Sequence, residues 1–322
     1  MTSPAADALG PLSVPLWIPV TLLAAAMQAW RTSLQAKLKG ILTPSGAGFV
    51  RFLYALPLEF VLFLLAIGLG GNGALPHGDL WFPAFCLGGG VAQILGTVML
   101  VHAFHSRGFV AGTAYAKTEA AQLVLISTLF LGIHLHPVAI AGIFVAFFGV
   151  LVLSLENSGM HWRDFFQGAR EPATRYGLGA ATAFALSSLA LRAASQHLEG
   201  SPSAVLTGLW VLFVTNTLQT VLQGAYLWSL QRGEFWKTLR LWRQVWPVGI
   251  LSAIGSWAWF TGFSITHVVL VRGLGQIDTI FVFFLGRHFL KEKLNPKEIA
   301  AILAVTLGAI LILFPDICRL ER

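Results

Sequence analysis

Long runs of hydrophobic residues recur along this chain, and short polar stretches separate them. A helix needs about 20 apolar residues to cross the roughly 30 Å hydrocarbon core of a bilayer. The expected membrane spans are residues 16–38, 46–68, 80–104, 109–131, 137–155, 175–197, 203–229, 245–266, 268–288 and 297–315. The pattern therefore predicts an all-α membrane protein of ten transmembrane helices.

Most connections between these spans are short. Two longer ones, residues 156–174 and 230–244, are rich in Trp, Arg and Lys, which is typical of interfacial helices that lie along the lipid headgroups. The expected organisation is an N-terminal tail, a first five-helix repeat, an interfacial linker, a second five-helix repeat and a C-terminal tail, at residues 1–15, 16–155, 156–174, 175–315 and 316–322.

The composition supports lipid as the surrounding solvent. Hydrophobic residues make up 56% of the chain and charged residues only 11%, whereas a soluble domain carries about 25% charged residues. The isoelectric point near 9.8 is no sign of nucleic-acid binding, because the basic residues lie in short loops between apolar segments. The first 15 residues lack Lys and Arg, so we expect the first span to stay as a membrane helix rather than act as a cleaved signal.

An internal repeat divides the chain into two halves. A shift of 159 positions places residues 130–137 on residues 289–296 and Gly149 on Gly308. Five spans match five spans in order, and an odd number of spans in each half means that the second half is inverted. Inverted repeats around a central site are typical of secondary transporters. Small residues in the fifth and tenth spans, Gly142 and Gly149 with Ala301 and Gly308, predict a close helix contact. We expect it within the chain, and a contact between two copies in a dimer is the alternative.

Several of these residues resemble the ten-helix EamA-type branch of the drug/metabolite transporter superfamily. The resemblance rests on Thr113–Glu119, Phe130–Gly132, Pro137 and Gly149 in the first half, and on Asp278, Phe289–Glu292 and Gly308 in the second. It implies a cavity enclosed by the first four spans of each half, with the fifth spans at the periphery. Ile133 stands where the family often has Glu, so we assign that position no transport role.

Charged side chains inside the expected spans are the first candidates for a functional site. Each costs roughly 2.5–3.5 kcal/mol to insert, so it needs a role. Lys117, Glu119 and Asp278 lie deepest, and the shift of 159 pairs Glu119 with Asp278 and Lys117 with Gln276. We expect a mid-membrane switch that binds substrate or a proton. The alternative is a static ion pair between Lys117 and Asp278 that joins two helices.

Further polar residues extend the candidate site. Gln28, Arg31 and Gln35 share one stripe of the first span, and Arg192 and Gln196 repeat the last two in the sixth. A guanidinium can bind a carboxylate through two hydrogen bonds, whereas hydrogen bonding between helices is the alternative role for each polar residue. For Arg31, Arg51 and Arg272, reaching the headgroups is a second alternative. The full candidate set is Arg31, Gln35, Gln93, Tyr115, Lys117, Glu119, Arg192, Gln196, Trp257, Gln276 and Asp278.

The expected function follows from the charge balance of this interior. Five basic and three acidic residues lie within the spans when the first two and last two residues of each span are left out. A positive cavity favours a substrate with a carboxylate or phosphate, including a zwitterion. We predict a secondary transporter for a small polar metabolite such as an amino acid, with export favoured over import and protons as the candidate coupling ion. The rival is a membrane enzyme or lipid-handling protein.

No catalytic, metal-binding or cofactor motif stands out in the sequence, so we expect no enzymatic activity. The expected partners are the substrate, membrane lipids and protons, in a monomer or homodimer of a bacterial cytoplasmic membrane. Loops after odd-numbered spans hold 14 Lys and Arg, and the opposite side holds 2. The positive-inside rule therefore places both termini outside, although the family resemblance implies cytoplasmic termini.

Overall fold

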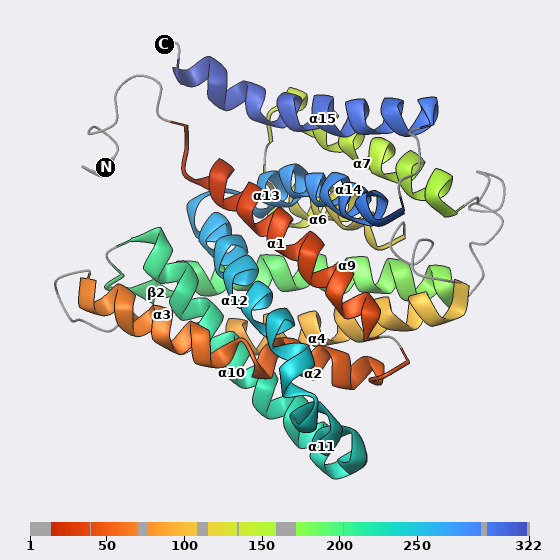
Figure 1. The fold of residues 1–322 in the computed structure, drawn as a ribbon. Coiled ribbons are helices and arrows are strands. Elements are labelled where there is room, and N and C mark those ends of the chain that lie inside the picture. The colour runs from red at the N-terminus through yellow and green to blue at the C-terminus, as the bar shows by residue number, and fades with distance from the viewer. Residues whose placement is uncertain are drawn as a thin grey trace.

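The computed structural model describes residues 14–38, 40–69, 76–107, 115–133, 135–158, 172–201, 203–290 and 295–320, and these are almost entirely helical (Figure 1). The helices of the first half are α1 (Trp17–Lys37), α2 (Pro44–Leu53), α3 (Leu56–Leu69), α4 (Trp81–Arg107), α6 (Glu119–Leu131) and α7 (Pro137–Ser158). Those of the second half are α9 (Pro172–Gln196), α10 (Ala204–Leu230), α11 (Arg232–Arg240), α12 (Trp242–Ile265), α13 (Val268–Leu274), the 3-10 helix η2 (Gly275–Ile277), α14 (Asp278–Leu290) and α15 (Pro296–Leu320).

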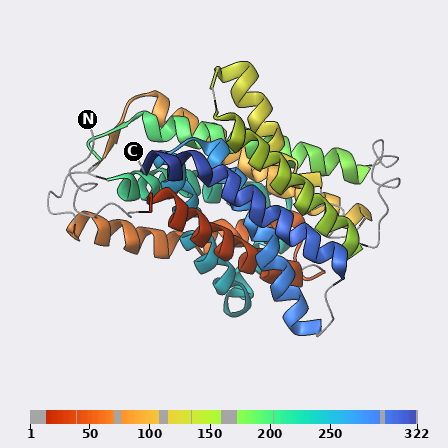
Figure 2. The ribbon, with the colours of Figure 1, turned by 90° about the horizontal axis from the view of Figure 1, so that it is seen from above.

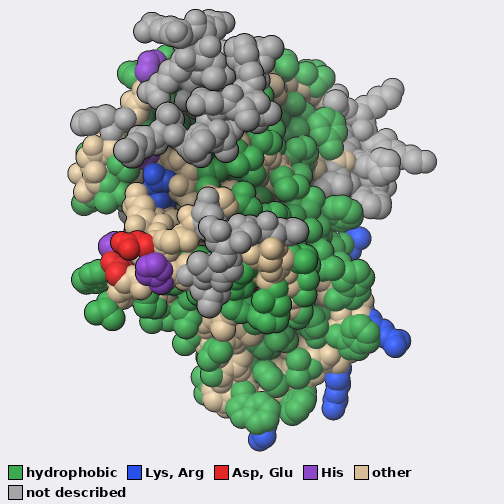
Figure 3. All heavy atoms as spheres, turned by 90° about the vertical axis from the view of Figure 1, so that its left-hand side faces the viewer, with side chains coloured by type: hydrophobic (Ala, Val, Ile, Leu, Met, Phe, Trp, Pro, Cys, Tyr) green, Lys and Arg blue, Asp and Glu red, His purple; other side chains and the backbone are tan. Residues whose placement is uncertain are grey.

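Seven helical segments are long and apolar enough to cross a membrane within the described ranges. They are α2 with α3 as Pro44–Gly68, then α4, α7, α9, α10, α12 and α15. The molecule also exposes large apolar side chains that water would penalise, among them Leu129, Phe130, Val221 and Leu303. Figure 3 shows hydrophobic side chains spread over much of one face. Such a surface fits contact with lipid tails.

Three of the expected spans fall outside those seven segments for identifiable reasons. Helix α1 is continuous over 21 residues, but Gln28, Arg31 and Gln35 lower its hydropathy. The span expected at residues 109–131 contains only the short helix α6 in its described part. The span expected at 268–288 is not continuous, because η2 separates α13 from α14.

The helices pack as an interior bundle with one peripheral pair. Helix α1 packs on α12, α4 packs on α9, and α10 contacts α2, α3, α4 and α12. Helices α7 and α15 lie against each other at one side of the molecule (Figures 1 and 2). The largest buried cluster contains Phe263, Leu123 and Leu191. This arrangement leaves the polar residues of α1, α6 and α14 in the centre.

The α7–α15 contact depends on glycine. A Cβ atom on Gly308 would lie 2.5 Å from the backbone nitrogen of Ala146 and 2.6 Å from the carbonyl oxygen of Gly142. A Cβ atom on Gly149 would lie 2.9 Å from the carbonyl oxygen of Ala301. These contacts confirm the small-residue seam predicted from the sequence, and they place it within one chain.

Replacing Gly308 with Val should therefore push α7 and α15 apart. Backbone atoms face the new side chain and cannot yield without moving the helix, so we expect a loss of about 1–3 kcal/mol in the free energy of unfolding. Thermal unfolding in detergent measures this loss. The same substitution at Gly88, where a Cβ would meet nothing within 4 Å, is the control. Equal midpoints for the two variants would contradict the tight seam.

Two of the inner helices are interrupted at equivalent positions. Tyr115 and Ala116 are helical, Lys117 and Thr118 form a turn, and α6 then begins at Glu119. In the second half, η2 precedes α14, which begins at Asp278. Helices α6 and α14 have 13 residues each and begin 159 positions apart. Broken helices at membrane depth are tolerated where protein buries the break or where it lines a cavity.

Polar structure at the ends of the helices completes the fold. Strands β1 (His77–Gly78) and β2 (Leu198–Glu199) pair antiparallel, which no sequence pattern predicts at this length. Beside them, Nδ1 of His197 lies 2.7 Å from Oδ2 of Asp79, and this hydrogen bond lowers the pKa of Asp79 below its ordinary value. Helix α11 lies in the predicted interfacial segment 230–244, while residues 159–171 of the other such segment lie outside the described residues.

Candidate functional site

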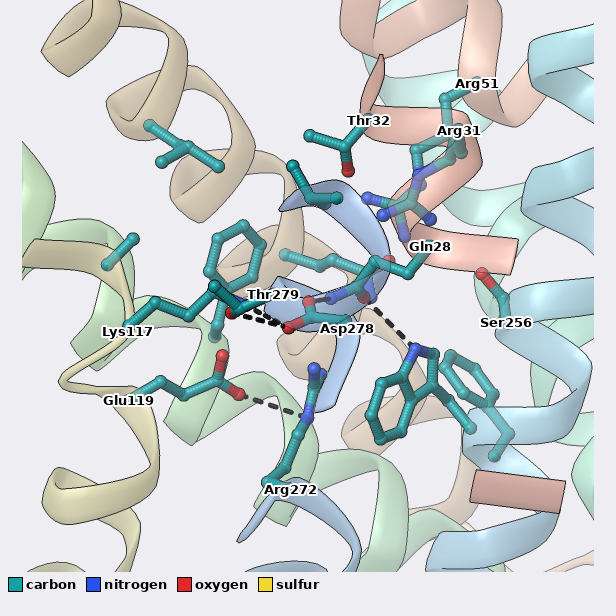
Figure 4. A pocket seen from close by; sticks show the side chains of 17 residues that line it. Gln28, Arg31, Thr32, Arg51, Lys117, Glu119, Ser256, Arg272, Asp278 and Thr279 are labelled. Atoms are coloured by element: carbon teal, nitrogen blue, oxygen red, sulfur yellow. Dashed lines mark hydrogen bonds and ion pairs between the residues drawn. The ribbon is translucent and has the colours of Figure 1, made fainter. Parts of the chain in front are cut away.

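A cavity of about 140 Å³ lies in the middle of the bundle, beside both helix interruptions (Figure 4). A cavity that holds one water molecule has a volume of roughly 10–15 Å³. This cavity therefore suits a metabolite of roughly ten non-hydrogen atoms. Polar side chains from several helices line it, namely Gln28, Arg31, Thr32, Arg51, Gln93, Lys117, Glu119, Ser256, Arg272, Asp278 and Thr279.

Asp278 is the most connected group in this cavity. It forms an ion pair with Lys117, and only 5% of its side chain is exposed. The side-chain amide of Gln28 donates to its second oxygen over 2.7 Å, and Trp259 Nε1 donates to the Gln28 amide oxygen over 3.1 Å. Asp278 therefore connects the helix interruption at Lys117 with α1 and α12.

Glu119 and Arg272 form a second ion pair, with Arg272 Nε 3.1 Å from a Glu119 oxygen. Ser188 Oγ accepts from the same nitrogen over 3.0 Å, and the guanidinium lies 4.6 Å from the centre of the Trp259 ring. Arg272 is thus held inside the bundle, and the alternative that it reaches the headgroups is wrong. Cation–π contact adds to this positioning.

Arg31 and Arg51 are the other two cations of the lining. The two residues are 6% and 7% exposed. Both line the cavity on the same side (Figure 4), and their charges interact. Within the part of the chain that the structure describes, neither has an ion-pair partner, and Arg31 Nε is buried without a hydrogen bond. With four basic and two acidic side chains, the lining has a formal net charge of plus two.

Five of the residues expected from the sequence line this cavity: Arg31, Gln93, Lys117, Glu119 and Asp278. Gln276 lines an adjoining space of about 30 Å³ together with Glu119 and Asp278. Both polar atoms of its side chain are buried and have no hydrogen-bond partner in the described structure. Six of the eleven expected residues therefore line the two adjoining spaces beside the helix interruptions.

The other five expected residues lie elsewhere, outside the lining of either space. Arg192 donates to the backbone carbonyls of Phe263 and Thr266, where α12 ends. Tyr115 is buried, and Gln196 is exposed at the end of α9. The remaining two bond to backbone carbonyls: Gln35 to that of Ala47 over 3.2 Å and Trp257 to that of Val205 over 3.2 Å.

Sequence reasoning undervalued several lining residues. Arg51 and Arg272 were visible as charges within apolar spans, but a single linear pattern does not separate an inward arginine from one that reaches the headgroups. Gln28 was visible in the polar stripe of the first span. Thr32 and Ser256 gave no signal, because hydroxyl groups commonly bond to their own helix.

The helix interruption also changes the relation between Lys117 and Glu119. In a continuous helix, two residues two positions apart point roughly 200° apart, so they cannot share a face. The turn at Lys117 and Thr118 removes that restriction, and both side chains line the cavity. The interruption therefore lets both side chains face the same cavity.

Seven apolar helical segments, packed around a buried charged cavity, indicate an integral, multi-pass membrane protein. Residues 174–314 match the EamA-like transporter family, which confirms the resemblance seen in the sequence. No curated protein matches the chain. A crystal structure of a protein with 18% sequence identity superposes with a TM-score of 0.65, covering 92% of this chain and 96% of that chain, and it supports the fold alone.

Proposed function

We propose that this protein is a secondary transporter that carries a small polar, anionic or zwitterionic metabolite across the cytoplasmic membrane by alternating access. The observation that carries the proposal is the central cavity, because it joins two interrupted helices to a lining with a formal charge of plus two. Interrupted helices at mid-membrane form the substrate and ion sites of many secondary transporters.

We also propose that the fold consists of ten membrane helices in two inverted repeats. The equal lengths of α6 and α14 and their offset of 159 positions support this arrangement. Helices α1 and α9 run in opposite directions, and so do α7 and α15 (Figure 1). Under this proposal, the contact of α1 with α12 and the contact of α9 with α4 are related by the symmetry of the two repeats. The two interruptions then lie on either side of one symmetry axis.

The rival function is chemistry on a lipid or its transfer. A lipid needs room for a headgroup and at least one acyl chain, and the cavity of about 140 Å³ is too small for both. Its charged residues also lie deep between the helices rather than at an interface. We therefore favour transport of a compact metabolite.

Glu119 is the group that we propose for proton coupling. It lies at a helix interruption, lines both adjoining spaces and pairs with Arg272 of α13. Gln276, whose amide has no hydrogen-bond partner among the described residues, borders the same space. A carboxylate with this access can exchange its proton when the cavity opens. Export is proposed on the resemblance to the family.

The proposed orientation has both termini outside the cytoplasm. Helix α1 begins at the side of the molecule where α15 ends (Figure 1). Lys37, Arg175 and Lys297 lie at helix ends on the opposite side. Asp79 and Glu199 stand beside the strand pair. A basic side facing the cytoplasm agrees with the positive-inside rule.

Counterflow tests the proposed function. Proteoliposomes are loaded with a mixture of unlabelled organic acids, phosphate esters and amino acids, and uptake of each labelled compound is followed without any ion gradient. We expect protein-dependent uptake of at least one compound, and its loss in proteoliposomes with Asp278→Asn. Uptake no faster than in empty liposomes for every compound would contradict the proposal.

A further inference from the structure

Two arginines of the cavity lining have no ion-pair partner among the described residues, although the buried carboxyl group of Glu59 attracts one of them, Arg51, from beyond ion-pair distance. Arg31 comes from α1 and Arg51 from α2, and both are more than nine-tenths buried. The two acids of the lining are already engaged, Asp278 with Lys117 and Glu119 with Arg272. Arg31 Nε is buried and has no acceptor among the described residues.

Such an arrangement is costly unless an anion joins it. Two buried like charges repel, and Arg31 Nε loses hydration that no acceptor among the described residues replaces. A group with two negative charges and several acceptor oxygens relieves both costs, because each guanidinium offers up to five N–H donors in a planar fork. One carboxylate has a single charge and leaves one arginine uncompensated.

We infer that the substrate bears two negative charges close together, as a phosphate monoester or a short dicarboxylate does, and that Arg31 and Arg51 bind them. This inference rests on the proposed function and narrows its substrate class. A zwitterion fits less well, because its ammonium group must displace Lys117 or Arg272 to reach a carboxylate. The rest of the ligand faces Phe184, Trp259 and Phe260, so it is compact and only partly polar.

Matched pairs of ligands test the inference on the unaltered protein. The purified protein is titrated with succinate and with succinamate, which has nearly the same shape but one charge fewer. Glycerol 3-phosphate and its methyl ester form the second pair, and serine and glutamine represent zwitterions. Binding is measured by isothermal titration, and exchange of each compound by counterflow. We expect at least tenfold tighter binding for the dianion of at least one pair, and the pair that responds shows which acid is preferred.

Arginine variants then locate the binding group. Arg31→Gln and Arg51→Gln should each weaken binding of that dianion at least tenfold. Arg175→Gln, which removes an exposed arginine on α9, should leave it unchanged. Equal binding of dianion and monoanion, or unchanged dianion binding in both cavity variants, would overturn the inference.

The two proposals fail in different ways. If serine or glutamine is exchanged and no dianion binds, the transport proposal stands and the two-charge inference is overturned. If no compound binds or is exchanged, both are overturned. Because the matched ligands are compared on the unaltered protein, a variant that fails to fold does not prevent a decision.

Discussion

Replacing Asp278 with Asn is expected to lower the free energy of unfolding by about 3–5 kcal/mol and to abolish transport. The loss arises because Lys117 would keep its charge in the interior without a partner, and removing one member of a buried pair costs about that much. The pair is well sheltered, with 5% of the Asp278 side chain and 18% of that of Lys117 exposed. Chemical unfolding in detergent measures the stability, and counterflow measures the transport.

A double variant separates the structural role of this pair from its transport role. Lys117→Met with Asp278→Leu removes both charges, so stability should return to near that of the unaltered protein while transport stays absent. The surface pair of Lys297 and Glu156, 2.9 Å apart with 69% of the Lys297 side chain exposed, is the matched control. Breaking it with Lys297→Met should cost less than about 1 kcal/mol. Full transport by the double variant would show that the ion pair has a structural role and no role in transport.

Replacing Glu119 with Gln is expected to uncouple transport from the proton gradient. The amide keeps nearly the same shape but binds no proton, so exchange of substrate should continue at a similar rate. Accumulation driven by a pH gradient should fall at least tenfold, to the level set by exchange alone. Counterflow and gradient-driven uptake are measured on the same batch of proteoliposomes.

Glu156→Gln serves as the control for this substitution, because Glu156 lies at the end of α7 and pairs with Lys297 outside the cavity. Both forms of transport should be unchanged in that variant. If Glu119→Gln accumulates substrate as well as the unaltered protein does, Glu119 is not the coupling group. Loss of exchange together with accumulation would instead assign Glu119 to substrate binding.

Much of the fold was predictable because membrane helices must be long and apolar. The contact between α7 and α15 was also predictable. Gly142 and Gly149 are seven residues apart, as are Ala301 and Gly308, and small residues at this spacing are typical of close helix contacts in membranes. The interruption at Gly275–Ile277 was not predictable, because glycine is common within membrane helices and does not by itself mark a break. Gly275 is needed there, as a Cβ would come within 2.1 Å of the Trp259 ring.

The candidate site was predictable to the extent that charge at depth is costly. Lys117, Glu119 and Asp278 were found from this cost and from their repeat positions. Arg192 was assigned to the site by the same reasoning, but the structure places it on the carbonyls of Phe263 and Thr266. The sequence indicates how deep a charged residue lies in the membrane. It does not indicate the partner of that residue, because the partner of Arg192 depends on where the neighbouring helix α12 ends.

The most direct test of alternating access needs no knowledge of the substrate. Cys86 and Cys318 are replaced by Ala, and Ser256, which lines the cavity, is replaced by Cys. A small anionic methanethiosulfonate that does not cross membranes is added to right-side-out or to inside-out vesicles. The control is Ser229→Cys, at the exposed end of α10, which should react only from the cytoplasmic side if the proposed orientation holds. We predict that Cys at position 256 reacts from both sides, whereas reaction from one side alone would contradict alternating access through this cavity.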